Sequence, residues 1–171
     1  MSNAEQVVVS RLTDPVELGA LRPLWLALHH HHRQLGASPP LQPDDDVSWR
    51  GREATYRRWL EAGEAIVLVA TQGDEPVGYA VVHVESGVDD DTFDFGARYA
   101  ELYTLSVLPG QRGRGVGTRL LEAMDEALRA ASIMTVTVAA MAGNTRALDF
   151  YRRNGFEPLE ATFHRAVPPP D

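Results

Sequence analysis

The stretch Arg112-Gly113-Arg114-Gly115-Val116-Gly117 has the residue types and spacing in this sequence that are best suited to chemistry. It stands between an apolar run and an amphipathic helix, where unpaired backbone N–H groups and the helix dipole together favour an anion. Glycines let the backbone approach phosphate oxygens closely, and Arg112 and Arg114 add positive charge. The stretch therefore favours a phosphate or pyrophosphate site, although a plain tight turn would use the same residues.

The spacing of the glycines argues against a nicotinamide or flavin dinucleotide. The dinucleotide-binding fold uses G-x-G-x-x-G and an acidic residue at the end of the next strand, about 20 positions on. Here the spacing is G-x-G-x-G, and the next expected strand ends in Val138-Ala139-Ala140 without an acid. A generic nucleotide-binding domain is therefore the weakest alternative.

The composition excludes several further enzyme classes. All 16 basic residues are arginines, so there is no phosphate-binding lysine of a P-loop hydrolase or kinase and no Schiff-base lysine. Without cysteine there is no thiol nucleophile, disulfide or Cys-ligated zinc. The formal charge of −8 disfavours nucleic acid as a partner. A length of 171 residues with 44% apolar content predicts one globular domain with its own core.

The elements that must position the loop run along the whole chain. Runs rich in β-branched residues predict strands at 7–12, 65–71, 77–84, 99–108 and 133–139, and a last extended segment at 156–167. Helical spacing of apolar residues predicts helices over 14–35, after Asp44, after Gly115 and over 144–154. This order, with a parallel crossover between residues 99 and 139, predicts a single α/β domain with a mixed sheet.

With the loop in this setting, the sequence resembles the GNAT superfamily of N-acetyltransferases. The R/Q-x-x-G-x-G/A signature of that family is matched by Arg112, Gly115 and Gly117, and residues 144–156 are similar to its second conserved block. The resemblance implies a GNAT domain over residues 5–167, with 1–4 and 168–171 as disordered ends. It also implies a mostly antiparallel sheet, flanked by about four helices, whose fourth strand carries a bulge and splays from the fifth.

The resemblance implies acetyl-CoA as the donor, with no metal ion. The backbone amides of the loop would hold the pyrophosphate, and Thr118 would add a hydroxyl. The fourth strand would pair with the pantetheine arm as an added strand would, and Asn144 matches a position that contacts this arm. The expected acetyl-CoA contacts are Leu105, Ser106, Val107, Arg112, Gly113, Arg114, Gly115, Val116, Gly117, Thr118 and Asn144.

Amide formation from an amine and a thioester requires a base, an oxyanion donor and an acid. By the resemblance, Glu101 is expected to be the base, with a solvent-facing Glu or a water chain as alternatives. The backbone N–H of Leu105 is expected to stabilise the oxyanion. Tyr151 is expected to protonate the coenzyme thiolate, although a packing role beside Phe150 is the alternative.

Other polar groups have open interpretations. Only His29 and His32 of the run His29–His32 share a helix face, so a metal site is disfavoured against a packed helix end. The resemblance adds a role in an acceptor pocket, together with Trp25, Trp49 or Tyr56. The acidic residues within 44–46 and 89–94 are expected to be solvated surface, or else to attract a cationic acceptor. His83 faces either the acceptor cleft or the surface.

These observations together predict a cytoplasmic N-acetyltransferase. Direct transfer in a ternary complex is expected, because no cysteine can carry an acyl intermediate. The expected acceptor is a small-molecule or peptide amine, with neither nucleic acid nor membrane as a partner, and a homodimer is left open. The alternative is a catalytically silent CoA-binding sensor or interaction domain. The identity of the amine and the preferred acyl group are also open.

Overall fold

The computed structural model describes residues 6–36, 40–88 and 92–168. Its strands are β1 (Val7–Leu12), β2 (Ala65–Gln72), β3 (Glu75–Ser86), β4 (Arg98–Val107) and β5 (Val136–Thr137), and they form one sheet in that order. Pairs from β1 to β4 are antiparallel, whereas β5 runs parallel to β4. The helices are η1 (Pro15–Leu21), α1 (Arg22–Gln34), α2 (Asp45–Glu61), η2 (Pro109–Gln111), α3 (Val116–Ala130) and α4 (Thr145–Arg153). The expected single α/β domain with a mixed sheet is confirmed.

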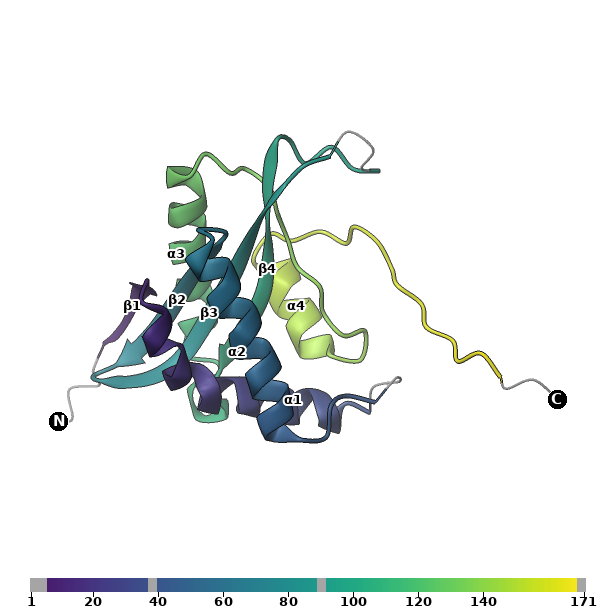
Figure 1. Cartoon of the computed structure of the whole chain (residues 1–171), viewed down its shortest axis with the longest axis horizontal. Coiled ribbons are helices and arrows are strands. Elements are labelled where there is room, and N and C mark those ends of the chain that lie inside the picture. Colours follow the sequence, from purple (N-terminus) through teal and green to yellow (C-terminus); the bar gives the residue numbers. More distant parts are fainter. Residues whose placement is uncertain (1–5, 37–39, 89–91, 169–171) are drawn as a thin grey trace.

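Helices cover both faces of the sheet (Figure 1). Each face buries its own core. Ile66 and Leu68 of β2 pack with α3 on one face, while Val67 and Val69 pack with η1, α1 and α2 on the other. Because successive side chains of a strand point to opposite faces, a strand covered on both sides is apolar throughout. This explains the unbroken apolar run at residues 65–70.

A β-bulge interrupts β4 in its centre. Val82 of β3 pairs with Leu102, but the preceding Val81 pairs with Thr104, so Tyr103 is the extra residue. Leu102 belongs to the α3 core, whereas Tyr103 contacts Tyr56 of α2 and Thr104 hydrogen-bonds to it. Two consecutive side chains thus face α2, and the alternation of the strand changes phase at this point.

The helix expected over 14–35 is divided in two. It begins as the 3₁₀-helix η1, capped by Asp14, and continues as α1. Pro23 has no N–H to donate to the carbonyl of Gly19, four residues earlier, and the N–H of Arg22 bonds to that carbonyl in the 3₁₀ pattern instead. The proline therefore marks the change of helix type.

Two expectations for the C-terminal third are wrong in extent. The strand expected over 133–139 is reduced to Val136–Thr137, and the segment expected over 156–167 forms no strand in the described part of the chain. Residues 157–168 are all exposed and run away from the domain (Figure 1). A strand over 156–167 would need a neighbouring strand for its backbone hydrogen bonds, and β5 is only two residues long.

The first acidic run is largely exposed, and each of its three aspartates also has a partner in the protein. Asp44 caps α2 through a 2.8 Å bond from the N–H of Val47 to its Oδ1. Asp45 pairs with Arg33 at 2.9 Å, and Asp46 pairs with Arg22 at 2.7 Å. In the second run, Asp94 accepts a bond from the N–H of Gly96, while 89–91 lie outside the described residues.

The expected disordered ends, 1–4 and 168–171, also lie outside the described residues except for Pro168. Over the ranges that are described, no helix has the length and apolar character needed to cross a membrane.

Candidate functional site

The loop before α3 has the backbone conformation of an anion site. Gly113 and Gly115 have φ angles of 78° and 81°, which is the left-handed region that favours glycine. Gly115 is the N-cap of α3 and makes no side-chain capping bond. Within the described residues, no acceptor is recorded for the N–H groups from Gly113 to Thr118. These donors, with the N-terminal end of the α3 dipole, are free to bind phosphate oxygens.

Gly117 has a different role from the other two glycines. A Cβ atom built on it would lie 3.0 Å from Cζ of Phe150, whereas nothing lies within 4 Å of such an atom on Gly113 or Gly115. Gly117 therefore allows α4 to pack against the start of α3. The sequence assigned all three glycines to the loop, and this packing role was not foreseen.

Arginines surround the loop. The Nε of Arg112 donates to the carbonyl of Val107 at 3.0 Å, which holds the side chain at the end of β4. Partial burial, together with the positive charge of Arg146, lowers the pKa of Arg112. Arg114 is exposed. The guanidinium groups of Arg112 and Arg146 repel each other beside the open amides. A bound pyrophosphate would relieve this repulsion.

The sequence interpretation missed Arg146. It lies in the first turn of α4, where a cation opposes the helix dipole. An arginine in the first turn of a helix is unfavourable for the helix itself, and this position could have marked Arg146 as a candidate to bind an anion.

The edge of β4 that faces away from β3 is open after the bulge. β5 pairs only with Ala100 and Glu101, and within the described residues no strand follows alongside Leu102–Val107. The N–H of Leu108 bonds to Val77 of β3, and strand groups alternate in direction, so the N–H groups of Leu105 and Val107 point to the open edge. The structure thus places the expected oxyanion donor, Leu105, on the edge where an added strand would pair.

Two of the expected acetyl-CoA contacts have their side chains engaged within the protein. The hydroxyl of Ser106 donates to the carbonyl of Leu24 at 2.8 Å on the α1 side of the sheet, so only its backbone remains for a ligand. Oδ1 of Asn144 accepts a 3.2 Å bond from the N–H of Ala147 as the cap of α4. The Nδ2 donor of Asn144 is then the group that a ligand could use.

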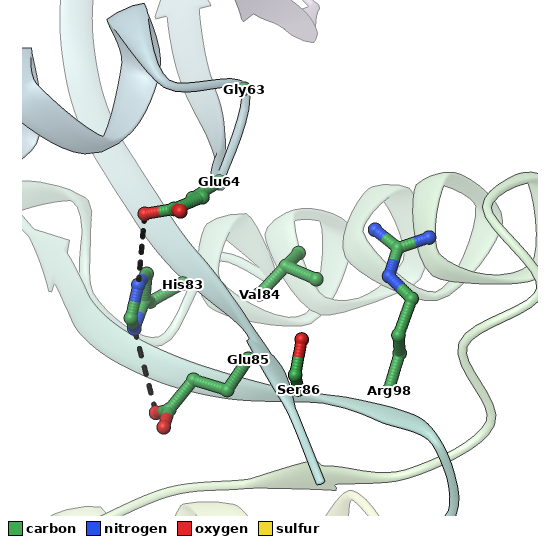
Figure 2. Close-up of a pocket in the computed structure, with 7 residues that line it drawn as sticks. All are labelled: Gly63, Glu64, His83, Val84, Glu85, Ser86 and Arg98. Atoms are coloured by element: carbon green, nitrogen blue, oxygen red, sulfur yellow. Dashed lines mark ion pairs between the residues drawn. The ribbon is translucent and has the colours of Figure 1, made fainter.

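Glu101 lies in a cluster of ionisable groups on the α2 side of the sheet. His83 of β3 is its direct cross-strand partner. The His83 ring stacks on Trp59 with 3.9 Å between centroids, and its side chain is only 17% exposed. Figure 2 shows His83 between two carboxylates, with Glu85 at 3.4 Å and Glu64 at 4.0 Å. His83 therefore faces the α2 side of the sheet beside Glu101 and is largely covered from solvent.

The surroundings of Glu101 raise the pKa of its carboxyl above the ordinary value. Burial is the main cause and the negative charge of Glu85 adds to it, while His83 and Arg52 act in the opposite direction. The cluster borders a pocket of about 310 Å³, lined by His83, Glu85 and Arg98 among others. Glu101 does not itself line this pocket, but its cross-strand partner His83 does. A half-buried carboxylate whose pKa is raised is suited to accept a proton.

Tyr151 lies on α4 between two aromatic rings. Phe150 and Phe156 have their centroids 5.5 and 5.4 Å from its ring. No hydrogen bond from its hydroxyl to another described residue is present, and burial raises the pKa of Tyr151 to about 12. The hydroxyl is thus protonated at neutral pH, as a general acid must be. The contacts with Phe150 and Phe156 fit the alternative packing role equally well.

The wall of the α2 side is aromatic and cationic. Tyr103, the bulge residue, meets Trp59 edge-on with 4.7 Å between centroids. The guanidinium carbon of Arg52 lies 4.2 Å from the centre of the Trp25 ring and 4.5 Å from that of Tyr103. The sequence interpretation missed Arg52 and Tyr103. The bulge at Tyr103 was implied by the resemblance, but nothing in the sequence separates Arg52 from the other arginines of α2.

The histidine run is divided between structural roles. His29 is buried, stacks on Trp25 and bonds to the carbonyl of Gln42 at 2.7 Å. His30 pairs with Asp45 at 2.7 Å. Burial lowers the pKa of His32, helped by the neighbouring histidines and by Arg52 and Arg112. No group of three or more His, Cys, Asp or Glu is arranged to hold a metal among the residues described.

Sequence relatives of the chain are acetyltransferases. The sequence model of the acetyltransferase (GNAT) family matches residues 24–156. An L-methionine sulfoximine/L-methionine sulfone acetyltransferase of Pseudomonas aeruginosa is 28% identical over 123 residues, which are 72% of this chain and 68% of the relative. A protein of the same description from Pseudomonas paraeruginosa matches to the same extent.

Solved structures share the fold. A protein from Bacillus halodurans superposes with a TM-score of 0.73 at 18% identity, covering 94% of this chain and 99% of that one. An aminoglycoside N-acetyltransferase in complex with CoA superposes with a TM-score of 0.71 at 18% identity, covering 98% of each chain. Since the family model spans most of the sequence, the chain belongs to the acetyltransferase (GNAT) family of acyl-CoA-dependent N-acetyltransferases.

Proposed function

We propose that the chain transfers the acetyl group of acetyl-CoA to the primary amine of a small molecule, by direct attack within a ternary complex. The observation that carries this proposal is that one strand, β4, has N–H groups at Leu105 and Val107 that are unpaired among the described residues and also bears the half-buried carboxylate of Glu101. Its open edge leads to the loop before α3, and Glu101 lies on the face toward α2. A donor bound along that edge and an amine beside Glu101 would therefore meet at β4.

The donor would be held mainly by backbone groups. The amides from Gly113 to Thr118 and the arginines Arg112 and Arg146 would bind the pyrophosphate. Leu105 and Val107 would pair with the pantetheine arm, and Nδ2 of Asn144 would contact it. Arg114 would contribute its charge from the exposed rim.

The reaction then follows from the positions of three groups. Glu101 accepts a proton from the ammonium form of the acceptor, so that the nitrogen lone pair is free to bond to the thioester carbon. The N–H of Leu105 donates to the oxygen that becomes negative in the tetrahedral intermediate. The C–S bond breaks as the nitrogen loses its second proton to solvent, and the thiolate takes a proton from Tyr151. Tyr151 regains a proton from solvent and Glu101 releases the one it accepted, so one proton is set free in each turnover. The products are the acetamide and coenzyme A.

The relatives support a small acceptor. The names of the Pseudomonas proteins specify amino-acid derivatives, and the solved CoA complex is named for aminoglycosides. These acceptors share a primary amine and little else, which fits a common donor site with a variable acceptor site. A cytoplasmic location belongs to this proposal as an expectation.

Release of coenzyme thiol from acetyl-CoA, measured over a panel of amines, tests the function. We expect turnover with at least one amine and initial-rate patterns that require both substrates bound together. Glu101→Gln should reduce the rate, whereas Glu122→Gln, an exposed residue of α3, should not.

The sensor alternative makes the opposite prediction. Tight binding of acetyl-CoA by calorimetry without turnover of any amine would overturn the enzymatic proposal and favour a silent binding domain. Acetylation of the protein itself as an obligatory intermediate would overturn direct transfer alone.

A further inference from the structure

Arg52 of α2 is a cation whose faces are covered and whose N–H groups are not paired. Its guanidinium carbon lies over the rings of Trp25 and Tyr103, at 4.2 and 4.5 Å from their centres, and 5.9 Å from that of Tyr56. Within the described ranges, no hydrogen bond or ion pair joins Arg52 to another residue. Stacking on aromatic faces orients the planar fork, so its in-plane donors are presented ready for a ligand.

Three of the other five arginines of α1 and α2 have carboxylate partners, and the remaining two, Arg50 and Arg58, are exposed. Arg22 pairs with Asp46, Arg33 with Asp45, and Arg57 with Glu53. Arg52 lies on the same two-helix layer, in a chain with an excess of acids, and still has no such partner in the described structure. A half-buried guanidinium favours a carboxylate or phosphate, which it can bind through two parallel hydrogen bonds.

The charge of Arg52 acts on the centre proposed for the reaction. It lowers the pKa of Glu101, against the effect of burial, and it lowers that of His32. Tyr103, over which Arg52 lies, is two residues from Glu101 on the same face of β4. Two residues of a strand span about 6.6 Å, so Arg52, stacked on Tyr103, lies near Glu101 along the α2 side of the sheet.

The α2 side of the sheet is acidic around His83, at the end away from Arg52. Glu101, Glu85 and Glu64 gather around His83, and the pocket drawn in Figure 2 lies on that side. One end therefore suits an ammonium group and the other a carboxylate. A molecule that carries both groups on neighbouring atoms matches this division of charge.

We propose that the acceptor is a free amino acid or a close derivative, whose carboxylate binds the guanidinium of Arg52 while its amine reaches Glu101. The inference rests on the proposed function and specifies its substrate class. Trp25 and Tyr103 hold Arg52 in place and exclude water from its faces. An acceptor that has an amine but no carboxylate leaves Arg52 unpaired and loses this contact.

Matched pairs of acceptors test the proposal. Initial rates are measured with L-methionine sulfone and L-methionine, and with the amine that results from decarboxylation of each. We expect the wild-type protein to favour the amino acids in kcat/KM. Arg52→Met, which keeps an unbranched side chain, should raise KM for the amino acids about ten- to hundredfold, the value of a charge-assisted pair, and should affect KM for the decarboxylated amines far less. Any effect of the lost charge on Glu101 should appear in kcat for both kinds of acceptor alike.

Two further variants separate charge from geometry. Arg52→Lys keeps the charge without the planar fork and should recover only part of the affinity. Arg50→Gln removes an exposed arginine two positions earlier on α2 and should leave the preference intact. Thermal unfolding of each variant identifies any loss that comes from misfolding.

The result that overturns the proposal is equal use of amino acids and their decarboxylated amines by the wild-type protein, or an equal rise in KM for both with Arg52→Met. Calorimetric titration with L-methionine sulfone in the presence of coenzyme A provides a readout without turnover. Binding that Arg52→Met abolishes supports the carboxylate site even if no amine is acetylated. In that case the proposed function fails and the site remains, whereas absence of binding to the wild-type protein removes the site.

Discussion

The face of the sheet covered by α3 offers a ligand backbone groups, whereas the face covered by α1 and α2 offers side chains. On the first face, the open amides from Gly113 to Thr118 and the free edge of β4 need no particular side chain to act. On the second face, Arg52, Tyr103 and Glu101 come from separate elements and act only through their mutual positions. Binding by backbone suits a ligand that is constant, and binding by side chains suits one that differs from protein to protein.

This comparison has a physical consequence for substitution. A backbone donor remains when the side chain changes, so the donor site is sensitive mainly to changes that alter the path of the chain. A side-chain site is lost when one atom is removed. Variants on the two faces should therefore fail in different kinetic parameters.

The largest expected effect is that of Glu101→Gln. Removing a base that acts in the reaction should lower kcat/KM for the acceptor about a hundredfold or more at neutral pH. Acetyl-CoA affinity, measured by calorimetry, should stay unchanged because the donor face is untouched. A variant that lost donor binding as well would break the separation of the two faces.

The pH profile sharpens the same assignment. Because the pKa of Glu101 is raised, activity should rise with pH through a limb displaced above the ordinary range of a glutamate. Glu101→Gln should remove that limb from the residual activity. A limb that persists in the variant would point to a water chain or another group as the base.

Tyr151→Phe should have the next largest effect. Loss of the hydroxyl removes the acid for the thiolate and should lower kcat about tenfold to a hundredfold, because water replaces it only in part. Acetyl-CoA binding should change less, since both aromatic neighbours keep their contacts. Unchanged thiol release would assign Tyr151 to packing and leave the donor face without a reacting side chain.

Arg112→Gln should weaken the donor side alone. Loss of one charge-assisted contact to pyrophosphate predicts about tenfold weaker acetyl-CoA binding, with KM for the acceptor unchanged at saturating donor. Arg129→Gln, at the far end of α3 in an exposed i,i+4 pair, is the matched control. An acceptor defect in Arg112→Gln would show that the two sites are not separate.

Gly117→Ala should have the smallest effect and should act on stability. The new methyl group would lie 3.0 Å from Cζ of Phe150, and overpacking of this kind costs about 1 kcal/mol or somewhat more. Thermal unfolding should show a decrease of about 2–4 °C. Gly110→Ala, where nothing lies within 4 Å, serves as control, and Phe150→Leu in the Gly117→Ala background should recover part of the loss.

The sequence correctly placed a glycine loop between a strand and a helix because these signals are local. A glycine loop, a helix start and the strand before it are consecutive residues, and Gly113 and Gly115 are required by backbone angles that the sequence pattern reflects. The length of β5 and the segment after Phe156 were predicted wrongly because strand formation depends on a partner elsewhere in the chain. β-branched spacing alone does not show whether that partner exists.

The contacts that support the proposed acceptor site were largely hidden from the sequence for the same physical reason. Arg50, Arg52, Arg57 and Arg58 are alike in the sequence of α2, and only contacts with α1 and β4 distinguish Arg52. His83 could be placed only once its register against Glu101 was known. Long-range contacts of side chains carry no spacing signal within a single sequence.

The extra residue at Tyr103 makes the number of residues in β4 matter more than their identities. Before the bulge, the odd-numbered residues of β4 face the α2 side of the sheet, and from Thr104 onward the even-numbered residues do. Deleting Tyr103 itself would remove the bulge and leave both halves facing as before, whereas deleting a neighbouring residue while the bulge remained would turn one half of the strand over. A deletion at Tyr103 should thus cost mainly the ring that packs on Trp59 and Arg52, while a deletion elsewhere in β4 should be far more damaging.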